Sequence, residues 1–215
     1  MSDLIILTAD GNMEALMKGL MSKIVKVETV NPFTMEIKSI TGADPAMRNR
    51  VVEFARPLIG KFKKIVIMLD FEGSGANITP QALQTTISQQ LAVNGWNKEN
   101  HHVVVFEPEC DAWLWVAEAQ MRATFKSPRG KVMEEGFRSF LIKKSFELKD
   151  TKPSRPKEAI EAICKELLIS RTSSLYEKLA ANASYKDCTD PAFLAFITQI
   201  RNWFAEDATK IELAK

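Results

Sequence analysis

The sequence contains little cysteine and histidine, and this scarcity excludes several kinds of site. Its 215 residues include three cysteines and two histidines. Cys110, Cys164 and Cys188 are widely spaced and lack the close pairs that hold zinc, so a zinc site is not expected. An odd number of separated thiols indicates a reducing compartment rather than a disulfide framework. His101 and His102 precede an apolar run, and we expect both in a surface loop rather than in catalysis.

Long apolar stretches are also missing. No apolar run approaches the roughly 20 residues that a helix needs to cross a bilayer. After Met1-Ser2-Asp3 the chain enters a short apolar segment directly, without the basic region and longer apolar stretch of a secretory signal. We therefore expect a cytoplasmic protein that does not contact membranes. The sequence has no internal repeat, no phosphate-binding Walker loop and no serine or cysteine nucleophile motif.

A large excess of one charge is absent as well, because the formal net charge is only +2. Any surface that attracts nucleic acid must therefore be local. The segment 121–157 has eleven Lys or Arg residues against four Asp or Glu. It could be an ordinary solvated surface, or it could meet phosphates and release their counterions. The residues that we select as candidates for nucleic-acid binding are Arg122, Lys126, Arg129 and Lys131.

Acidic residues follow an apolar run in the middle of the chain. Asp70-Phe71-Glu72-Gly73 stands directly after the run 65–69, which has the character of a buried strand. Since side chains alternate along a strand, Asp70 and Glu72 are expected to point to the same side, with Phe71 turned toward the core. Two neighbouring carboxylates repel each other unless a cation or a proton relieves them. A metal site and a solvated turn both fit this pattern.

Two further acidic clusters also follow apolar runs. Asp10 comes after the run 4–7, and Glu14 lies in the first turn of the amphipathic helix that follows. Glu14 could equally be a partner for the helix dipole. Glu109 and Asp111 come after the run 103–106, where Pro108 suits the first turn of a helix. Because ligands of open α/β sheets bind outside the carboxyl ends of the strands, all three clusters could meet in one crevice.

The alternation of apolar strands and amphipathic helices predicts an α/β fold with a central, mostly parallel sheet flanked by helices. Strands are expected at 4–7, 24–30, 34–39, 65–70 and 103–106. Helices are expected at 13–21, 42–59, 79–93, 109–120, 133–146, 157–168, 172–180 and 191–203. We divide the chain into an α/β domain, 1–120, and a basic, mainly helical C-terminal extension packed on it, 121–215. The aromatic stripe of the last helix is expected to be core.

The motifs resemble those of a known family. Asp10-Gly11-Asn12-Met13-Glu14 resembles the Glu-Gly-x-x-Glu motif of Toprim-like domains, which topoisomerases, primases and OLD-type nucleases share, and Asp70-Phe71-Glu72-Gly73 resembles their Asp-x-Asp-Gly. The segment 107–115 is similar to the Pro-Glu-x-Glu-x-Trp-Leu signature of a largely uncharacterised prokaryotic Toprim-like family found near defence loci. Lys152-Pro153, Tyr176-Glu177-Lys178 and the segment 188–193 resemble the tail of that family. The resemblance covers nearly the whole chain in order.

The resemblance implies a Mg²⁺-dependent or Mn²⁺-dependent nucleic-acid enzyme, with phosphodiester cleavage as its reaction and an antiphage defence system as its setting. It implies catalytic roles for Asp10, Glu14, Asp70 and Glu72, with metal ligation by Asp10, Asp70 and Glu72. Glu109 and Asp111 would support that site. Asp10, Glu72 and Asp111 each differ by one methylene from the family pattern, which keeps the charge but changes the reach of the carboxylate.

These departures leave a second interpretation open. In it the chain is a catalytically silent Toprim-like scaffold that binds nucleic acid or a partner protein encoded in the same defence operon. A small-molecule phosphate-transfer enzyme is a third alternative, because a fold does not determine a function.

Overall fold

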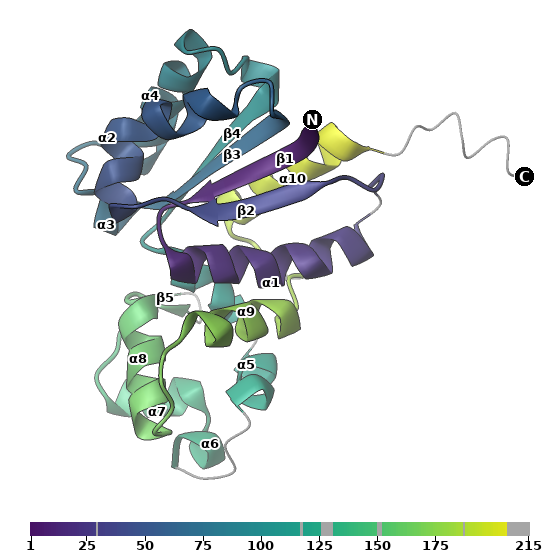
Figure 1. Ribbon diagram of the computed structural model, residues 1–215. Helices are drawn as coiled ribbons and strands as arrows, with labels where there is room; N and C mark the ends of the chain where they lie inside the picture. The colour runs from purple at the N-terminus through teal and green to yellow at the C-terminus, as the bar shows by residue number, and fades with distance from the viewer. Residues whose placement is uncertain (29, 117, 126–130, 150–151, 187, 206–215) are drawn as a thin grey trace, which may run out of the picture.

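The computed structural model describes residues 1–28, 30–116, 118–125, 131–149, 152–186 and 188–205. Its centre is a sheet of four parallel strands in the order β2-β1-β3-β4 (Figure 1). The predicted α/β class with a parallel sheet is confirmed. The strands are β1 (Ser2–Thr8), β2 (Met35–Ser39), β3 (Phe62–Asp70) and β4 (His101–Phe106). Their aliphatic runs are buried because helices cover both faces of the sheet.

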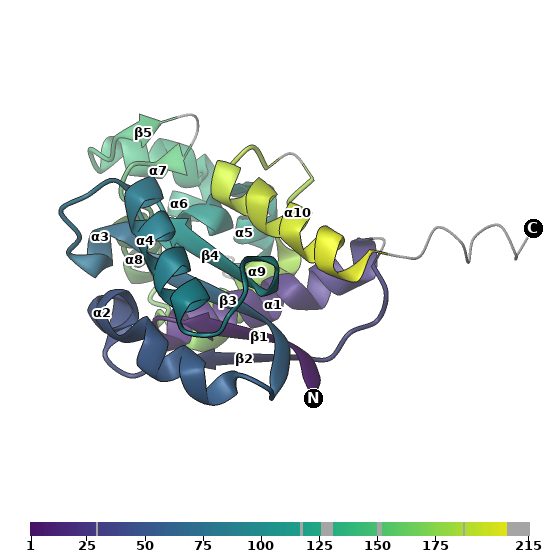
Figure 2. The same ribbon diagram turned by 90° about the horizontal axis from the view of Figure 1, so that it is seen from above.

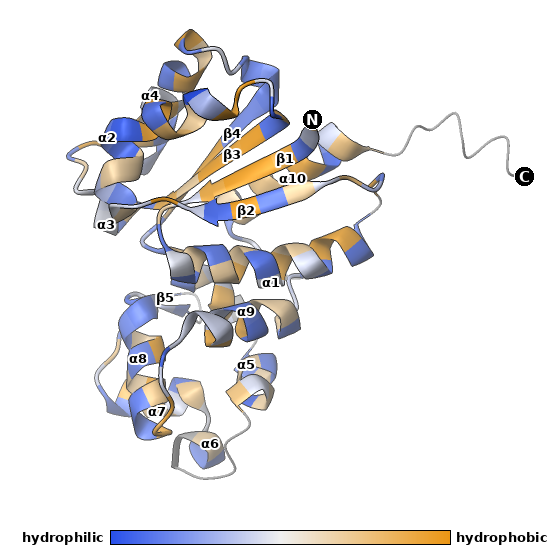
Figure 3. Cartoon of the chain, in the orientation of Figure 1, coloured by the Kyte–Doolittle hydropathy of each residue, from blue (hydrophilic) through white to orange (hydrophobic). Residues whose placement is uncertain are grey.

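Two helices lie on each face of the sheet (Figures 1 and 2). One face carries α1 (Gly11–Val27) and α10 (Pro191–Phe204), and the other carries α2 (Ala43–Ala55) and α4 (Pro80–Val93). Short helices η1 (Arg56–Leu58), α3 (Phe71–Ser74) and η2 (Lys98–Asn100) occupy the connections. In Figure 3 long stretches of β1 and β3 are orange, whereas β2 and the helices show both orange and blue, as expected for central strands buried between amphipathic helices.

The C-terminal region is mainly helical, as predicted, and lies beneath α1 in Figure 1. Before it, η3 (Cys110–Val116) follows β4, and α5 (Glu118–Phe125) crosses the predicted boundary at residue 120. The region itself contains α6 (Lys131–Glu135), α7 (Phe137–Lys143), α8 (Pro156–Glu166) and α9 (Ser173–Asn182). A small antiparallel pair, β5 (Leu148–Lys149) and β6 (Lys152–Pro153), separates α7 from α8. Helix α10 then returns to the sheet. In the described part of the chain, no helix is both long and apolar enough to span a membrane.

Three local predictions were wrong. The segment 24–27 continues α1 and is not a strand, because Ile24 is buried on the same face of the helix as Leu20 and Met21. The expected helix 133–146 is broken at Gly136, whose φ of 88° is incompatible with a right-handed helix. His101 and His102 belong to β4 rather than to a surface loop.

One continuous hydrophobic core joins the sheet to the C-terminal helices. Trp113 of η3 illustrates this, since its ring makes edge contacts with Phe106 of β4 and with Phe193 of α10. Phe196 is fully buried in the same cluster, which confirms that the aromatic stripe of the last helix is core. The packing of η3 fixes the backbone that follows β4, and this is where the acidic segment lies.

Candidate functional site

The acidic segments follow three neighbouring strands at one edge of the sheet. Thr8 of β1 pairs with Met68 of β3, and Asp70 at the end of β3 pairs with Phe106 of β4. Asp10 lies two residues after Thr8, and Asp70 lies two residues after Met68. Because Thr8 and Met68 are paired, Asp10 and Asp70 occupy equivalent positions along the two neighbouring segments. We call five carboxylates at this end of the sheet the acid edge: Asp10, Asp44, Asp70, Glu109 and Asp111.

Asp70 lies at the centre of the acid edge and is buried. Its backbone N–H donates to Oδ1 of Asp44 at 2.7 Å, and its own Oδ1 accepts the N–H of Cys110 at 2.7 Å. Burial, followed by the negative charge of Asp44, raises the pKa of Asp70 well above its ordinary value of 3.8. Asp70 thereby connects α2, β3 and the segment after β4.

Asp44 is a member of the site that the sequence did not reveal. Asp44 falls in the first turn of the helix expected at 42–59. The structure places its carboxyl group against the backbone N–H of Asp70 in β3, which is 26 residues further along the chain. Burial raises the pKa of Asp44, and the nearby charge of Asp10 raises it further. A Cβ atom at Gly73 would lie 2.4 Å from Oδ2 of Asp44, so the glycine after Glu72 is required by close packing.

Asp10 is half-buried and caps helix α1. Its Oδ1 accepts the N–H groups of Asn12 at 2.8 Å and of Met13 at 2.9 Å. This is the usual role of an aspartate at a helix N-cap, where it satisfies two backbone donors that have no partner inside the helix. One oxygen of Asp10 therefore has a structural role.

Glu14 is engaged elsewhere. Its carboxylate accepts the N–H of Ser39 at 2.8 Å and the hydroxyl of Ser39 at 2.6 Å, and it forms an ion pair with Lys18. Burial alone would raise the pKa of Glu14, but the hydrogen bonds from Lys18 and Ser39 lower it overall. The structure thus ties Glu14 to the end of β2 and not to Asp70.

Glu72 does not share the environment of Asp70. The expected strand alternation stops at Asp70, because helix α3 begins at Phe71. Asp70 is consequently buried, while Glu72 is exposed to solvent. The backbone N–H of Glu72 donates to the carbonyl of Pro108 at 3.2 Å, so its main chain remains beside the segment after β4.

Glu109 and Asp111 are both buried and have different partners. Glu109 lies 3.6 Å from Nζ of Lys157, and burial raises its pKa to about 7. Asp111 accepts the hydroxyl of Tyr176 at 2.5 Å, and that hydroxyl in turn accepts from Arg171 at 2.6 Å. Burial is the main cause that raises the pKa of Asp111.

Tyr176 is fully buried and connects α9 to the acid edge. The sequence singled out Tyr176 only through a family resemblance, without a role. Its hydroxyl and the guanidinium of Arg171 hold Asp111 in place from the C-terminal region. Lys157 of α8 approaches from the same region. Cys110 is buried among these acids, as expected for a packing residue.

The four candidates for nucleic-acid binding are only partly described. Arg122 of α5 is half-buried, and its guanidinium donates to the carbonyl of Met133, which gives it a role inside the protein. Lys126 and Arg129 lie outside the described residues. Lys131 begins α6, and its side chain is likewise outside the described part.

The acid edge has the type of donor atom that a divalent cation binds, but these atoms are not arranged around a cation. Carboxylate oxygens are the ligands that Mg²⁺ prefers. Among the described residues, however, no group of three or more His, Cys, Asp or Glu is placed to hold a metal ion. Asp10, Asp44 and Asp70 each direct one oxygen to a backbone N–H, so one oxygen of each is engaged by the fold. The residues therefore fit the cation in their chemistry but not in their present arrangement.

Comparison with known proteins found no matching family model, no matching curated protein and no matching solved structure.

Proposed function

We propose that the chain is a Toprim-like, Mg²⁺-dependent nucleic-acid enzyme that cleaves phosphodiester bonds. The observation that carries this proposal is the concentration of five carboxylates at the carboxyl ends of β1, β3 and β4. Burial there keeps the pKa values of Asp44, Asp70 and Asp111 raised. Neighbouring carboxylates raise the pKa values of Asp44 and Asp70 further. The mutual repulsion of these negative charges is costly without a compensating positive charge. A bound Mg²⁺ would offset that repulsion and polarise a phosphate.

The residues of the chain have distinct tasks in this proposal. Asp70 and the exposed Glu72 would hold the cation, with the free oxygen of Asp10 as a further donor. Asp44 positions the backbone of Asp70, and Asp111 is fixed by Tyr176 and Arg171. The ammonium of Lys157, whose side chain is 43% exposed, pairs with Glu109 at the border of the acid edge, where it would also meet a substrate phosphate.

The test compares metal binding and cleavage in matched variants. Calorimetric titration with Mn²⁺ and cleavage of plasmid and single-stranded substrates are measured for the wild type, Asp70→Asn and Glu72→Gln. Asp3→Asn is the control, because Asp3 lies at the opposite end of β1 and pairs with Lys63. We expect Asp70→Asn and Glu72→Gln to lose cleavage by at least about 100-fold, because each removes a proposed ligand of the metal, and the control to retain it.

Equal cleavage by wild type, Asp70→Asn and Glu72→Gln would refute the proposed site. Glu72 is exposed, so Glu72→Gln keeps the test valid even where Asp70→Asn disturbs folding. Far-UV circular dichroism of each variant verifies that the fold is retained.

The second candidate function is a catalytically silent scaffold that binds nucleic acid or a protein of a defence system. It is favoured by one observation, namely that no group of three or more His, Cys, Asp or Glu among the described residues is placed to hold a metal ion. In that case millimolar Mn²⁺ produces no binding heat, and no variant of the acid edge changes cleavage. Retention of DNA or RNA by the metal-free protein would then support the scaffold.

A further inference from the structure

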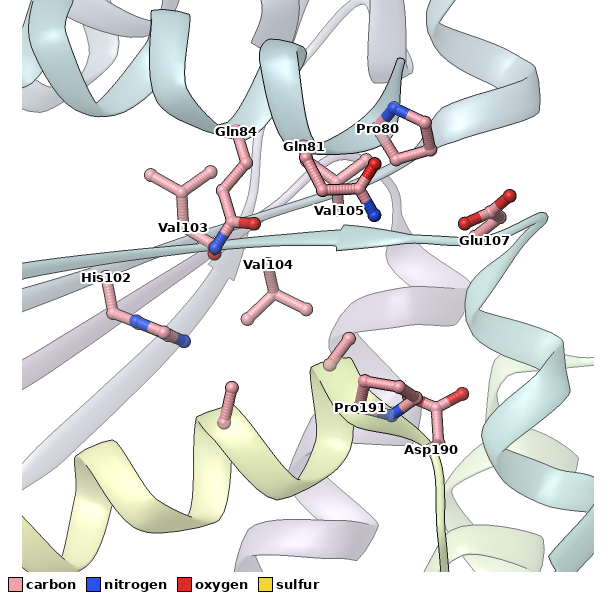
Figure 4. Close-up of a pocket in the computed structure, with 12 residues that line it drawn as sticks. Pro80, Gln81, Gln84, His102, Val103, Val104, Val105, Glu107, Asp190 and Pro191 are labelled. Atoms are coloured by element: carbon pink, nitrogen blue, oxygen red, sulfur yellow. The ribbon is translucent and has the colours of Figure 1, made fainter.

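The outer side of β4 has no neighbouring strand in the described part of the chain. β4 ends the order β2-β1-β3-β4 and pairs with β3 alone. A cavity of about 310 Å³ extends along that outer side, between α4 and α10 (Figure 4). A second cavity of about 600 Å³ continues it toward the start of the strand, and the two share Gln84, His102 and Val103. We call the two cavities together the β4 groove.

The backbone of β4 faces this groove. Nε2 of Gln84 donates to the carbonyl of Val103 at 2.8 Å, and Figure 4 shows Gln84 extending from α4 to the strand. In a strand, the N–H and C=O of one residue point to the same side and alternate along the chain. His101, Val103 and Val105 therefore direct their backbone groups outward. The amide of Gln84 supplies one hydrogen bond that a neighbouring strand would otherwise provide.

The two edge strands of the sheet differ in their protection. β2 carries Glu36 and Lys38, whose side chains form an ion pair and are 42% and 59% exposed. Such charges discourage a further strand from pairing. β4 contains no Lys, Arg, Asp, Glu or Pro. Its edge therefore lacks the charges and prolines that often prevent strand addition, and a partner strand would have to replace the amide of Gln84 at the carbonyl of Val103.

The wall of the groove is also shaped to admit a backbone. Helix α10 contributes Ala192 and Ala195 to the lining, one turn apart. Figure 4 shows the short side chains of α10 below β4 and the glutamines of α4 above it. Small residues leave room for a strand, which lies about 4.8 Å from its neighbour.

We propose that the β4 groove binds β4 of a second copy of this chain, antiparallel, so that the two sheets join across a two-fold axis near Val103. The outward groups of His101, Val103 and Val105 would then exchange about six backbone hydrogen bonds with the partner copy. Strand addition of this kind obtains its affinity from main-chain bonds.

The charges at the two ends of β4 favour a second copy of the chain as the occupant, and they favour antiparallel pairing. At the start of β4, Lys98 lines the second cavity of the groove. The end of β4 and the groove rim carry Glu107 and Asp190. Antiparallel pairing about a two-fold axis places the net positive start of each copy beside the net negative end of the other. Helices α4 and α10 of both copies would extend the contact toward the roughly 1,200 Å² that a stable interface requires.

The test is the mass of the full chain in solution at a concentration on the order of 100 μM, measured by sedimentation equilibrium. We expect twice the 24.2 kDa of a single chain for the wild type. Ala195→Arg fills the groove from an exposed position and should give the single-chain mass. Leu194→Arg is the control, because Leu194 is 49% exposed and lines a different cavity on the other side of α10.

A wild-type mass of 24.2 kDa, or an unchanged dimer in Ala195→Arg, would overturn the proposal. Hydrogen exchange gives a second, independent measurement. The amides of His101, Val103 and Val105 should exchange at least about tenfold more slowly in the wild type than in Ala195→Arg. Equal exchange in the wild type and in Ala195→Arg would also overturn the proposal. It would do so even if a different protein binds in the groove.

Discussion

At the scale of single residues, the buried carboxylates of the acid edge are held by donors from distant parts of the chain. Asp44 accepts a backbone N–H from β3, Asp70 accepts one from the segment after β4, and Asp111 accepts the hydroxyl of Tyr176. Each of these bonds offsets part of the cost of removing a carboxylate from water. The fold therefore positions these acids whether or not a cation is bound.

His102 provides a prediction on pH dependence. Burial, followed by the neighbouring His101, lowers the pKa of His102 from 6.5 to about 4. Between these pH values the unfolded chain binds a proton that the folded chain excludes. The contribution of a neutral His102 to stability is therefore complete above pH 6.5 and is lost as the pH falls toward 4. Its full size is about 3 kcal/mol.

The measurement is urea unfolding of the wild type and of His102→Gln at pH 7.5 and pH 4.5. Glutamine does not titrate, so the variant should lose less stability than the wild type when the pH is lowered, by about 2 kcal/mol. An identical loss in both proteins would show that His102 titrates normally. Because the protein is compared with itself at two pH values, the packing cost of the substitution cancels.

At the scale of elements, the close approach of α1 and α9 attaches the C-terminal region to the sheet. A Cβ atom at Gly19 would lie 2.1 Å from the carbonyl oxygen of Glu177 and 3.0 Å from Cβ of Ala180. Only glycine allows the two helices to pack at this distance. The position of Tyr176, and hence of Asp111, depends on this contact.

Gly19→Ala should therefore destabilise the protein by about 1–3 kcal/mol, although alanine is the better helix former. Denaturant unfolding monitored by circular dichroism measures this change. Lys18→Ala is the control, because Lys18 is the adjacent residue and its side chain is 48% exposed. Equal stabilities of the two variants would contradict the packing argument.

The sequence predicted those elements whose signal is local. Apolar runs indicated β1, β3 and β4, and the helix expected at 172–180 is α9, which Thr172 caps by accepting the N–H of Leu175. The strand expected at 24–30 was wrong because its β-branched residues favour a strand locally, whereas burial of Ile24 on the face of α1 decides the outcome. Tertiary contacts overrode local propensity there.

The site was less predictable than the fold, since its bonds join residues far apart in the chain. Asp44 and Asp70 are 26 residues apart, and Asp111 and Tyr176 are 65 apart. No periodic pattern encodes such pairs. From the positions of the strand ends, the sequence predicted where the acids lie. The hydrogen-bond partner of each carboxylate could be identified only from the three-dimensional structure.

At the scale of the whole molecule, the division at residue 120 does not separate two cores. Trp113 packs between β4 and α10, and a single hydrophobic cluster includes residues from both parts. Helix α10 belongs to the C-terminal part in sequence but covers the sheet in space (Figure 2). A shared core makes the two parts depend on each other for stability.

We therefore predict a single cooperative unfolding transition. Far-UV circular dichroism reports on all helices, and fluorescence reports on the four tryptophans, of which Trp113 lies at the junction, so the two urea curves should coincide. Phe196→Ala should lower both midpoints together and cost about 3–4 kcal/mol, because Phe196 is fully buried in the shared core. Leu194→Ala, which alters a half-exposed residue of the same helix, should change both far less. Two separated transitions, or a Phe196→Ala effect confined to one signal, would mean that the sheet and the C-terminal helices fold as independent units.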